Sequence, residues 1–299
     1  MEEQMGKPEK QHMGRQMKRQ RKKQPEITVI MGVYNPEDEQ RLRRAVASIV
    51  RQSFRDWEMI LYDDGSREEC AALIRRAARM DRRIRYVRGG KNRGLAAALN
   101  ACIRQARGRY LARMDADDLC RGDRLARQYA FLEKHPRFQW VGSCAQLTDD
   151  EGVWGFQPAP AVPGKEDFLY NSPYIHPTVM FRRRVLLESG GYDTSRRYRQ
   201  CEDYELFLRL HSRGYRGANL QEPLLRYRED CLSHRRRTLG RRWREAMLRW
   251  RGFRSLGILR AETLAYVGKP LLAGLVPGPL HHQIRKWVKR DHGRKRKNL

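Results

Sequence analysis

The chain has 299 residues, enough for one large domain or for one domain with appendages. Hydrophobic residues make up 40% of it, so a sizeable core is expected, but no apolar run approaches the roughly 18 residues that span a membrane. Lysine and arginine total 63 against 35 aspartates and glutamates. The resulting formal charge of +28 indicates a polyanionic partner, namely nucleic acid, an anionic membrane surface or a phosphate-bearing substrate. The six cysteines form no C-x-x-C pair, which argues against a zinc site or a disulfide framework.

The N-terminal segment, residues 1–25, is polar and basic without a periodic apolar face. We expect it to be a disordered tail and not a secretory signal. Apolar residues from Ile27 onward predict a buried strand over residues 27–33. Asn35 and Pro36 then predict the N-cap and the first position of a helix.

Further strands are predicted at residues 58–62, 84–87 and 109–114, with helices at 71–80 and 95–106 between them. Such alternation with short loops is typical of a parallel sheet that carries helices on both faces. The later part is less regular, with strands expected at 140–147 and 178–181 and a helix at 205–213. We therefore expect a Rossmann-like α/β domain over residues 26–232.

Two acidic sequences follow predicted strands: Asp63-Asp64-Gly65-Ser66 and Asp115-Ala116-Asp117-Asp118. Parallel sheets bind ligands at the carboxyl ends of their strands. Hard divalent cations prefer carboxylate oxygens, and a metal that bridges two phosphates needs only one or two protein carboxylates. Each sequence also has a purely structural interpretation, because aspartate caps helices and Asp-Gly forms turns.

Seven stretches occur in a characteristic order between about residues 26 and 230, and together they resemble the family-2 glycosyltransferases. These are inverting enzymes of the glycosyltransferase-A fold. The matching stretches are ITVIMGVYN at 27–35, YDDGS at 62–66, NRGLAAALN at 92–100, ARMDADD at 112–118, IHPTVMFRR at 175–183, GGYD at 190–193 and CEDYELFLRL at 201–210.

The resemblance implies a role for each matching residue. Asp117 would bind Mg²⁺ or Mn²⁺, His176 could bind the metal or the diphosphate, and Asp203 would be the general base. Asp115 would approach the ribose or the diphosphate, and Asp63 would accept a hydrogen bond from the base. The remaining residues expected around the nucleotide are Val33, Tyr34, Asn35, Asp64, Asn92, Arg93 and Glu202.

The C-terminal region, residues 233–299, has a different composition. Its apolar residues recur every three or four positions among arginines, which predicts a basic amphipathic helix: Leu239, Trp243, Ala246, Trp250, Phe253 and Gly257. We expect this helix to hold the protein on the cytoplasmic face of an anionic membrane, with the apolar tract 271–280 beside it. The alternative is that the stripe packs on the catalytic domain or on a second subunit.

The resemblance implies transfer of a sugar from a UDP- or dTDP-sugar to a lipid-linked or growing-glycan acceptor, in bacterial surface polysaccharide or glycolipid synthesis. The alternative is a basic nucleic-acid-binding protein without catalytic activity, which the charge favours. No named nucleic-acid motif is present, so we expect no nucleic-acid partner. A P-loop is excluded because Leu95 stands where the motif requires lysine, and the G-x-G-x-x-G fingerprint is absent.

Overall fold

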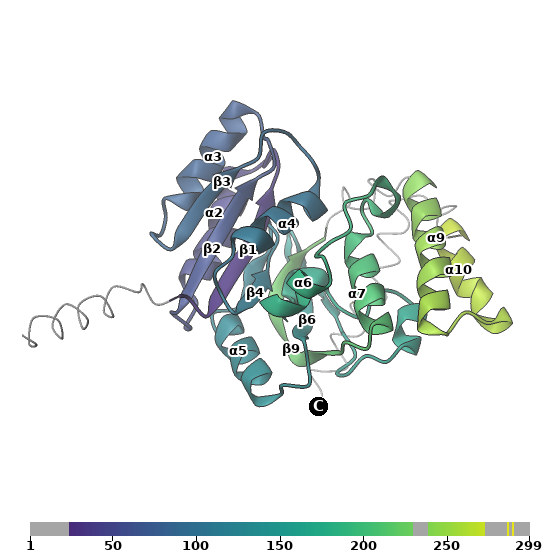
Figure 1. Cartoon of the computed structure of the whole chain (residues 1–299). Coiled ribbons are helices and arrows are strands. Elements are labelled where there is room, and N and C mark those ends of the chain that lie inside the picture. Colours follow the sequence, from purple (N-terminus) through teal and green to yellow (C-terminus); the bar gives the residue numbers. More distant parts are fainter. Residues whose placement is uncertain (1–23, 230–238, 273–285, 287–288, 290–299) are drawn as a thin grey trace, which may run out of the picture.

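The computed structural model describes residues 24–229 and 239–272, together with Lys286 and Lys289. These residues form a mixed α/β structure around one nine-stranded sheet in the order β3-β2-β1-β4-β8-β6-β9-β5, with β7 paired to β6 (Figure 1). The strands are β1 (Ile27–Val33), β2 (Trp57–Asp63), β3 (Ile84–Arg88), β4 (Tyr110–Arg113), β5 (Leu119–Cys120), β6 (Trp140–Asp149), β7 (Gly152–Gln157), β8 (Met180–Arg182) and β9 (Gly217–Arg228).

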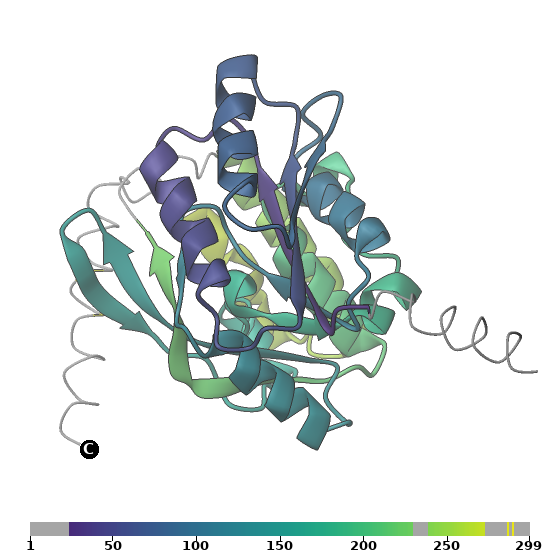
Figure 2. The same ribbon diagram turned by 90° about the vertical axis from the view of Figure 1, so that its left-hand side faces the viewer.

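The first four strands are parallel, as the alternation of strands and helices predicts. Strand β8 is antiparallel to both β4 and β6, and it joins the parallel part to a second half in which β6 and β9 are parallel. Strands β5 and β7 are added in antiparallel orientation, and β6 and β7 form a hairpin that projects from the sheet (teal in Figure 2). The α/β fold class is thus confirmed, with a mostly parallel sheet.

Alternation along the strands sends side chains to two separate cores. Val29 and Met31 of β1 pack with α2 (Glu39–Val50), α3 (Glu68–Ala78) and α5 (Arg124–Lys134). Ile30, between them, packs on the opposite face with α4 (Leu95–Gln105), α6 (Arg183–Glu188) and α7 (Glu202–Ser212). A strand covered on both faces reads as the continuous apolar run seen at residues 27–33. Short 3₁₀ helices η1 (Glu166–Leu169), η2 (His176–Thr178) and η3 (Arg196–Tyr198) connect the later elements.

The expected start of the first helix was wrong. Helix α2 begins at Glu39, and its N-cap is Asp38, whose side chain accepts hydrogen bonds from the amides of Gln40 and Arg41. Asn35 instead adopts a positive φ of 42° and bonds to the loop after β2. A side-chain acceptor aligned with the first-turn amides defines the cap, and Asp38 supplies it.

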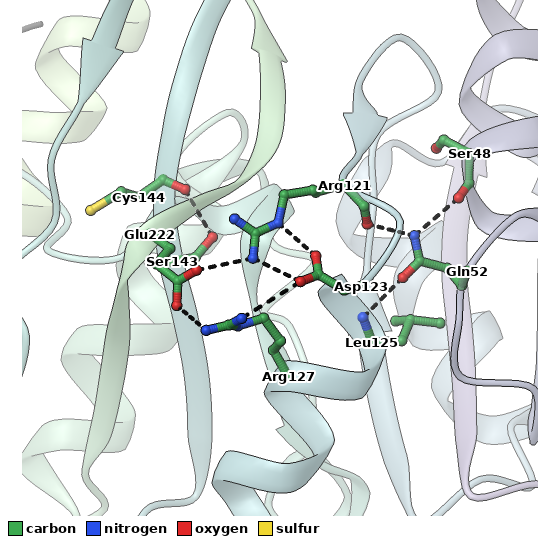
Figure 3. A network of polar contacts seen from close by, with 9 residues as sticks. All are labelled: Ser48, Gln52, Arg121, Asp123, Leu125, Arg127, Ser143, Cys144 and Glu222. Carbon is green, nitrogen blue, oxygen red and sulfur yellow. Dashed lines mark hydrogen bonds and ion pairs between the residues drawn. The ribbon is translucent and has the colours of Figure 1, made fainter. Parts of the chain in front are cut away.

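A network of hydrogen bonds holds the segment that follows Asp115–Asp118 in place (Figure 3). Arg121 donates to Asp123 at 2.6 Å and to Glu222 of β9 at 3.0 Å. Gln52 donates to the carbonyl of Arg121 at 2.7 Å and accepts from the amide of Leu125 at 3.0 Å. These bonds tie β5 and the start of α5 to α2 and β9, so the segment after Asp118 is held at both ends.

The C-terminal helices α9 (Leu239–Leu256) and α10 (Leu264–Leu272) lie beside α7, at the end of the molecule away from α2 and α3 (Figure 1). η4 (Ala261–Thr263) precedes α10. The predicted stripe is divided between two environments. Ala246 and Phe253 are buried, whereas Leu239, Trp243 and Trp250 are 73%, 59% and 42% exposed.

No helix of the described residues is both long and apolar enough to cross a membrane. Five of the six cysteines are described, and each of them is free. The expectations for residues 1–23, for Cys231 and for residues 273–280 of the apolar tract concern positions outside the described part of the chain.

Candidate active site

Three adjacent strand ends bring the two acidic sequences to one edge of the sheet. Val33 at the end of β1 pairs with Asp63 at the end of β2, and Ile30 pairs with Arg113 at the end of β4. Because β2 and β4 are both parallel to β1 and flank it, Asp63-Asp64 and Asp115–Asp118 follow carboxyl ends at the same edge of the sheet. The sheet order β2-β1-β4 thus places both acidic sequences where parallel sheets bind ligands.

A cleft of about 1070 Å³ opens at this edge. It lies between the end of β1, the loop before α4, the first turns of α4 and the segment from Asp193 to Glu202. Six of the residues expected around the nucleotide line it: Val33, Tyr34, Asp64, Asn92, Arg93 and Glu202. Its rim also carries basic side chains, including Lys91, Arg104 and Arg199, which suit an anionic ligand.

Asp64 fixes the loop that forms one wall of the cleft. Its carboxylate accepts hydrogen bonds from the amide of Arg93 at 3.1 Å and from the amide of Gly94 at 2.7 Å. Burial raises the pKa of Asp64, and the two amide donors partly oppose that rise. Gly65 allows the close approach, because a Cβ there would lie 2.6 Å from the backbone of Lys91 and its φ is 75°.

Asn35 and Asp63 stand behind this wall and hold the loops together. Asp63 is fully buried, and its carboxylate accepts from the amide of Ser66 and from the hydroxyl of Tyr86, both at 2.8 Å. The Asn35 amide donates to the Ser66 hydroxyl at 2.9 Å. Neither residue is part of the cleft lining among the described residues. In the structure, then, both act as supports for the loop after β2.

The second acidic sequence concentrates negative charge in little space. Asp117 is exposed, yet the surrounding protein and the neighbouring Asp115 carboxylate raise its pKa to about 6. Asp118 is buried, and its Oδ1 accepts from the amide of Arg228 at 2.8 Å. Its Oδ2 has no hydrogen-bond partner in the described part of the chain. Burial first, and then Asp115 and Asp117, raise the pKa of Asp118 well above its usual value.

A hard divalent cation fits this arrangement chemically. It would offset the crowded carboxylates of Asp115 and Asp117, and a buried carboxylate oxygen of Asp118 already stands without a donor. Within the described ranges, no group of three or more His, Cys, Asp or Glu side chains could hold a metal by itself. The donor set therefore fits a metal that takes part of its ligands from the phosphates of a substrate.

His176 lies in η2 and is buried. Its Nε2 shares a hydrogen bond of 2.7 Å with the hydroxyl of Tyr192. Burial and then the charge of Arg113 lower the pKa of His176 well below its usual value, so the imidazole is neutral. A metal could use the neutral ring only through Nδ1 unless Tyr192 moved.

Asn100 of α4 holds Tyr192 in place. Its side-chain amide donates to the carbonyl of Tyr192 at 2.8 Å, and its oxygen accepts from the amide of Tyr192 at 2.9 Å. Asn100 also lines the cleft. Its two hydrogen bonds therefore link helix α4 directly to residues 190–193 and, through Tyr192, to His176.

Glu202 and Asp203 begin α7, where acidic residues are also favoured by the helix dipole. Glu202 lines the cleft, whereas Asp203 is partly buried next to it. Burial is the main cause that raises the pKa of both carboxyls, and Asp203 adds to the rise at Glu202. Carboxylates of raised pKa are stronger proton acceptors than ordinary ones, which is what a general base requires.

The fold and the order of the sequence stretches define a glycosyltransferase domain, and the comparisons agree. The sequence profile of Glycosyl transferase family 2 matches residues 28–191. The chain belongs to this family and is a glycosyltransferase. It is 37% identical to the putative glycosyltransferase EpsE of Bacillus subtilis (strain 168), over 88% of this chain and 94% of EpsE. It is 30% identical to the amylovoran biosynthesis glycosyltransferase AmsE of Erwinia amylovora, over 70% of this chain and 79% of AmsE.

Two solved structures share the glycosyltransferase-A fold with this chain. One is the mannosyltransferase PcManGT from Pyrobaculum calidifontis in complex with GDP-Man and Mn²⁺, with a TM-score of 0.58 and 20% identity. It is matched over 89% of this chain and 80% of that one. The other is residues 1–349 of S. aureus TarS, with a TM-score of 0.62 and 17% identity, over 89% of this chain and 78% of that one.

Arg113, Tyr192 and Asn100 had no predicted role, although each lies inside one of the seven stretches that resemble the family. An arginine within the apolar strand before Asp115 was a usable signal for Arg113, since such a residue is rarely buried without a reason. The bonds of Tyr192 and Asn100 join segments 92 residues apart, so no local pattern announces them.

Proposed function

We propose that this enzyme transfers a sugar from a nucleoside-diphosphate sugar to an acceptor hydroxyl, with a divalent metal and with inversion at the anomeric carbon. The observation that carries the proposal is the cleft between the end of β1 and the start of α7. One wall carries residues expected at the nucleotide, and the other ends at Glu202, beside the expected base Asp203. The bound ligands named for the solved relatives, GDP-Man with Mn²⁺ and, for TarS, UDP and UDP-GlcNAc, support the donor class.

In the proposed reaction, Asp203 takes the proton of the acceptor hydroxyl as that hydroxyl attacks the sugar. A hydroxyl is a poor nucleophile, so removal of its proton during attack lowers the barrier. The raised pKa of Asp203 suits this role. A single displacement with one carboxylate as base and none as nucleophile inverts the anomeric centre, by the logic known from inverting hydrolases.

Asp117, together with His176, would hold Mg²⁺ or Mn²⁺, and Asp115 would approach the ribose or the diphosphate. When bound, such a cation neutralises the charge that develops on a leaving diphosphate. The residues proposed around the rest of the donor are Val33, Tyr34, Asn35, Asp63, Asp64, Asn92, Arg93 and Glu202. The exposed ring of Tyr34 and the basic side chain of Arg93 face a cleft large enough for a nucleotide sugar.

We place the reaction in bacterial surface polysaccharide or glycolipid synthesis, with a UDP- or dTDP-sugar as donor and a lipid-linked or glycan acceptor. This rests on what relatives are named for, such as the putative teichuronic acid biosynthesis glycosyltransferase TuaG of Bacillus subtilis (strain 168), which is 29% identical over 78% of this chain and 88% of TuaG. The nucleotide base and the sugar are expectations, and a panel of nucleoside-diphosphate sugars assayed for released nucleoside diphosphate tests them.

For location we propose the cytoplasmic side of the cell membrane, with peripheral binding through α9 and α10. Exposed apolar side chains gather there: Leu239, Trp243, Trp250, Leu264, Leu271 and Leu272. Arg242 donates to the carbonyl of Pro270 at 3.1 Å, so the end of α10 lies beside the start of α9. Lys286 is a poor candidate for membrane contact, because it pairs with Asp149 at 2.7 Å.

A thermal-shift panel tests the donor site directly. Nucleoside diphosphates with Mn²⁺ should raise the melting temperature by mass action, and the increase should vanish in excess chelator. Duplex DNA at moderate salt should not raise the melting temperature. A nucleic-acid-binding protein would instead be stabilised by DNA and not by nucleoside diphosphates with Mn²⁺. Stabilisation by DNA alone would contradict the proposed function.

A further inference from the structure

Arg113 is a buried arginine at the last position of β4, two residues before Asp115. Its backbone is fixed on both sides, since its amide donates to the carbonyl of Val179 at 2.9 Å and its carbonyl accepts from Arg124 at 2.7 Å. Leu111, two residues earlier, packs in the core shared with α4 and α7. Because side chains alternate along a strand, Arg113 points to the same face, toward the start of α7.

The Arg113 guanidinium is poorly satisfied for a buried group. Its Nη1 donates to Asp115 Oδ2 at 2.6 Å, and its Nε has no hydrogen-bond partner among residues 24–229 and 239–272. The other two largest buried arginines differ. Arg124 donates to Gln128 and to the Arg113 carbonyl, and Arg249 donates to Glu245 and to the carbonyls of Leu169, Tyr170 and Tyr266.

Burying a cation is costly unless it is paired and hydrogen-bonded, so the stability of the fold alone gives no reason for this arrangement. The acidic residues around Arg113 do provide a reason for its burial. Its charge lowers the pKa of Asp117 and Asp118 on its own segment, and that of Glu202 and Asp203 on α7. These two acidic groups are far apart in sequence and share this cation.

We propose that Arg113 is a positioning residue for the transfer reaction, a fixed internal cation that holds Asp115 toward the donor and balances the negative charge of Glu202 and Asp203. The inference rests on the proposed function. Of the acidic groups, only Asp115 is bound directly, and it remains 28% exposed while the Arg113 side chain is 3% exposed. Arg113 thus orients a carboxylate that reaches the solvent side without itself leaving the interior.

Two separable effects follow from this arrangement. The first is geometric, because Asp115 loses its anchor when the planar guanidinium is replaced, even by lysine. The second is electrostatic, because Asp203 loses a nearby positive charge only when the replacement is neutral. The titratable or charged groups that act on Asp203 are Arg113 from β4, Arg241 from α9, Tyr192 from the GGYD segment, and Cys201, Glu202 and Tyr204 on its own segment.

The test compares Arg113→Lys and Arg113→Met with the wild-type enzyme, using kcat and KM for the donor across pH 5–9. Both variants should raise the donor KM about tenfold, since each loses the bond to Asp115. Only Arg113→Met should move the acidic limb of the kcat profile upward, by about half a pH unit or more. Arg249→Lys is the matched control: it alters a buried arginine outside the cleft lining, so it should lower the melting temperature and leave both readouts unchanged.

The outcomes separate this inference from the proposed function. If the wild-type enzyme releases no nucleoside diphosphate from any donor, the proposed function is wrong. If the wild-type enzyme is active and both variants keep its donor KM and its acidic limb, Arg113 has no positioning role. If one of the two variants does not fold, the other still tests the inference. Arg113→Lys by itself tests whether the bond to Asp115 matters, through its donor KM.

Discussion

Asp117 is the residue whose substitution separates metal binding from folding. Its side chain is exposed, and asparagine has nearly the same shape, so Asp117→Asn should fold normally. It should weaken binding of nucleoside diphosphate with Mn²⁺ at least about tenfold, because a charged ligand to the metal is lost. Isothermal titration with and without chelator measures the effect. Wild-type affinity in the variant, or full wild-type activity in excess chelator, would contradict the metal assignment.

Substitution of Asp118 tests how much the charge of the site lowers the stability of the folded protein. Its pKa is raised in the folded protein, so its carboxylate costs stability only above the unfolded pKa of about 3.9, and the cost grows as pH rises toward the folded value. Asp118→Asn removes that charge and can still accept from the Arg228 amide. With chelator present, the variant should melt several degrees higher than the wild type at pH 7, since about 1 kcal/mol corresponds to about 2–4 °C.

The same difference should shrink toward zero near pH 4, where the unfolded carboxyl also becomes protonated. Asp123→Asn is the opposite control, because the Arg121 hydrogen bond lowers the pKa of Asp123 and its removal should give no gain at neutral pH. An Asp118→Asn variant that melts no higher than wild type at pH 7 would show that its charge is compensated in solution.

Helix α9 is an integral part of the hydrophobic core, to which it contributes Leu248 and Phe253. Its Gly252 lies against Leu208 of α7, and a Cβ there would stand 2.5 Å from a Leu208 methyl carbon. Gly252→Val should therefore destabilise the protein by about 1–3 kcal/mol through overpacking, although valine is the better helix former. Gly268→Ala in α10 is the matched control, since its Cβ would meet nothing within 4 Å and should be neutral or slightly stabilising.

Urea denaturation of the two variants measures these free energies. If Gly252→Val is as stable as wild type, α9 does not pack on α7 in solution. Folding without the C-terminal region would then be expected as well.

The sequence predicted the strands β1 to β4 and the helices between them, but it missed helices α5 and α6 and strands β5, β7 and β9. The runs that became β1, β2 and β4 are apolar because both faces of those strands are covered, and their parallel order followed from the alternation with helices. Strand β9 was missed because its sequence GANLQEPLLRYR contains Pro223 and no regular alternation. Its pairing with β6 is set by tertiary contacts, including register shifts around Cys144.

The candidate site was predictable to a similar extent. Motif order indicated which residues gather at one edge, and the sheet order brings Asp63 and Asp115 there. The sequence could not indicate that Asp63 bonds to Tyr86, or that the His176 ring bonds to Tyr192. Those partners come from distant elements, and their positions depend on how the two cores pack.

The exposed apolar face of α9 and α10 predicts that the protein binds membranes reversibly. Leu239, Trp243 and Trp250 share one face of α9, and each basic residue near an anionic surface contributes about 1 kcal/mol. The full chain should float with vesicles of anionic lipid and release at high salt. Trp243→Ser combined with Trp250→Ser should reduce the floated fraction severalfold, whereas Val162→Ser, also at an exposed position, should not.

Truncation before α9 is a poor substitute for this comparison, because it would remove Leu248 and Phe253 from the core and expose the side of α7 that α9 covers. Equal flotation of the wild-type protein and the double tryptophan variant would remove α9 from the account of membrane binding. Flotation with neutral vesicles alone would remove the electrostatic contribution.

We propose, above all, that this enzyme transfers a sugar from a nucleoside-diphosphate donor with Asp203 as the base. The most direct measurement is mass-spectrometric detection of nucleoside diphosphate released from a donor panel with Mn²⁺, for wild type and Asp203→Asn, with donor affinity measured in parallel. We predict release from at least one donor by wild type, and a fall in kcat by a factor of about 10² to 10⁴ in the variant at unchanged donor affinity. No release from any donor, or an unchanged kcat with a collapsed donor affinity in Asp203→Asn, would contradict it.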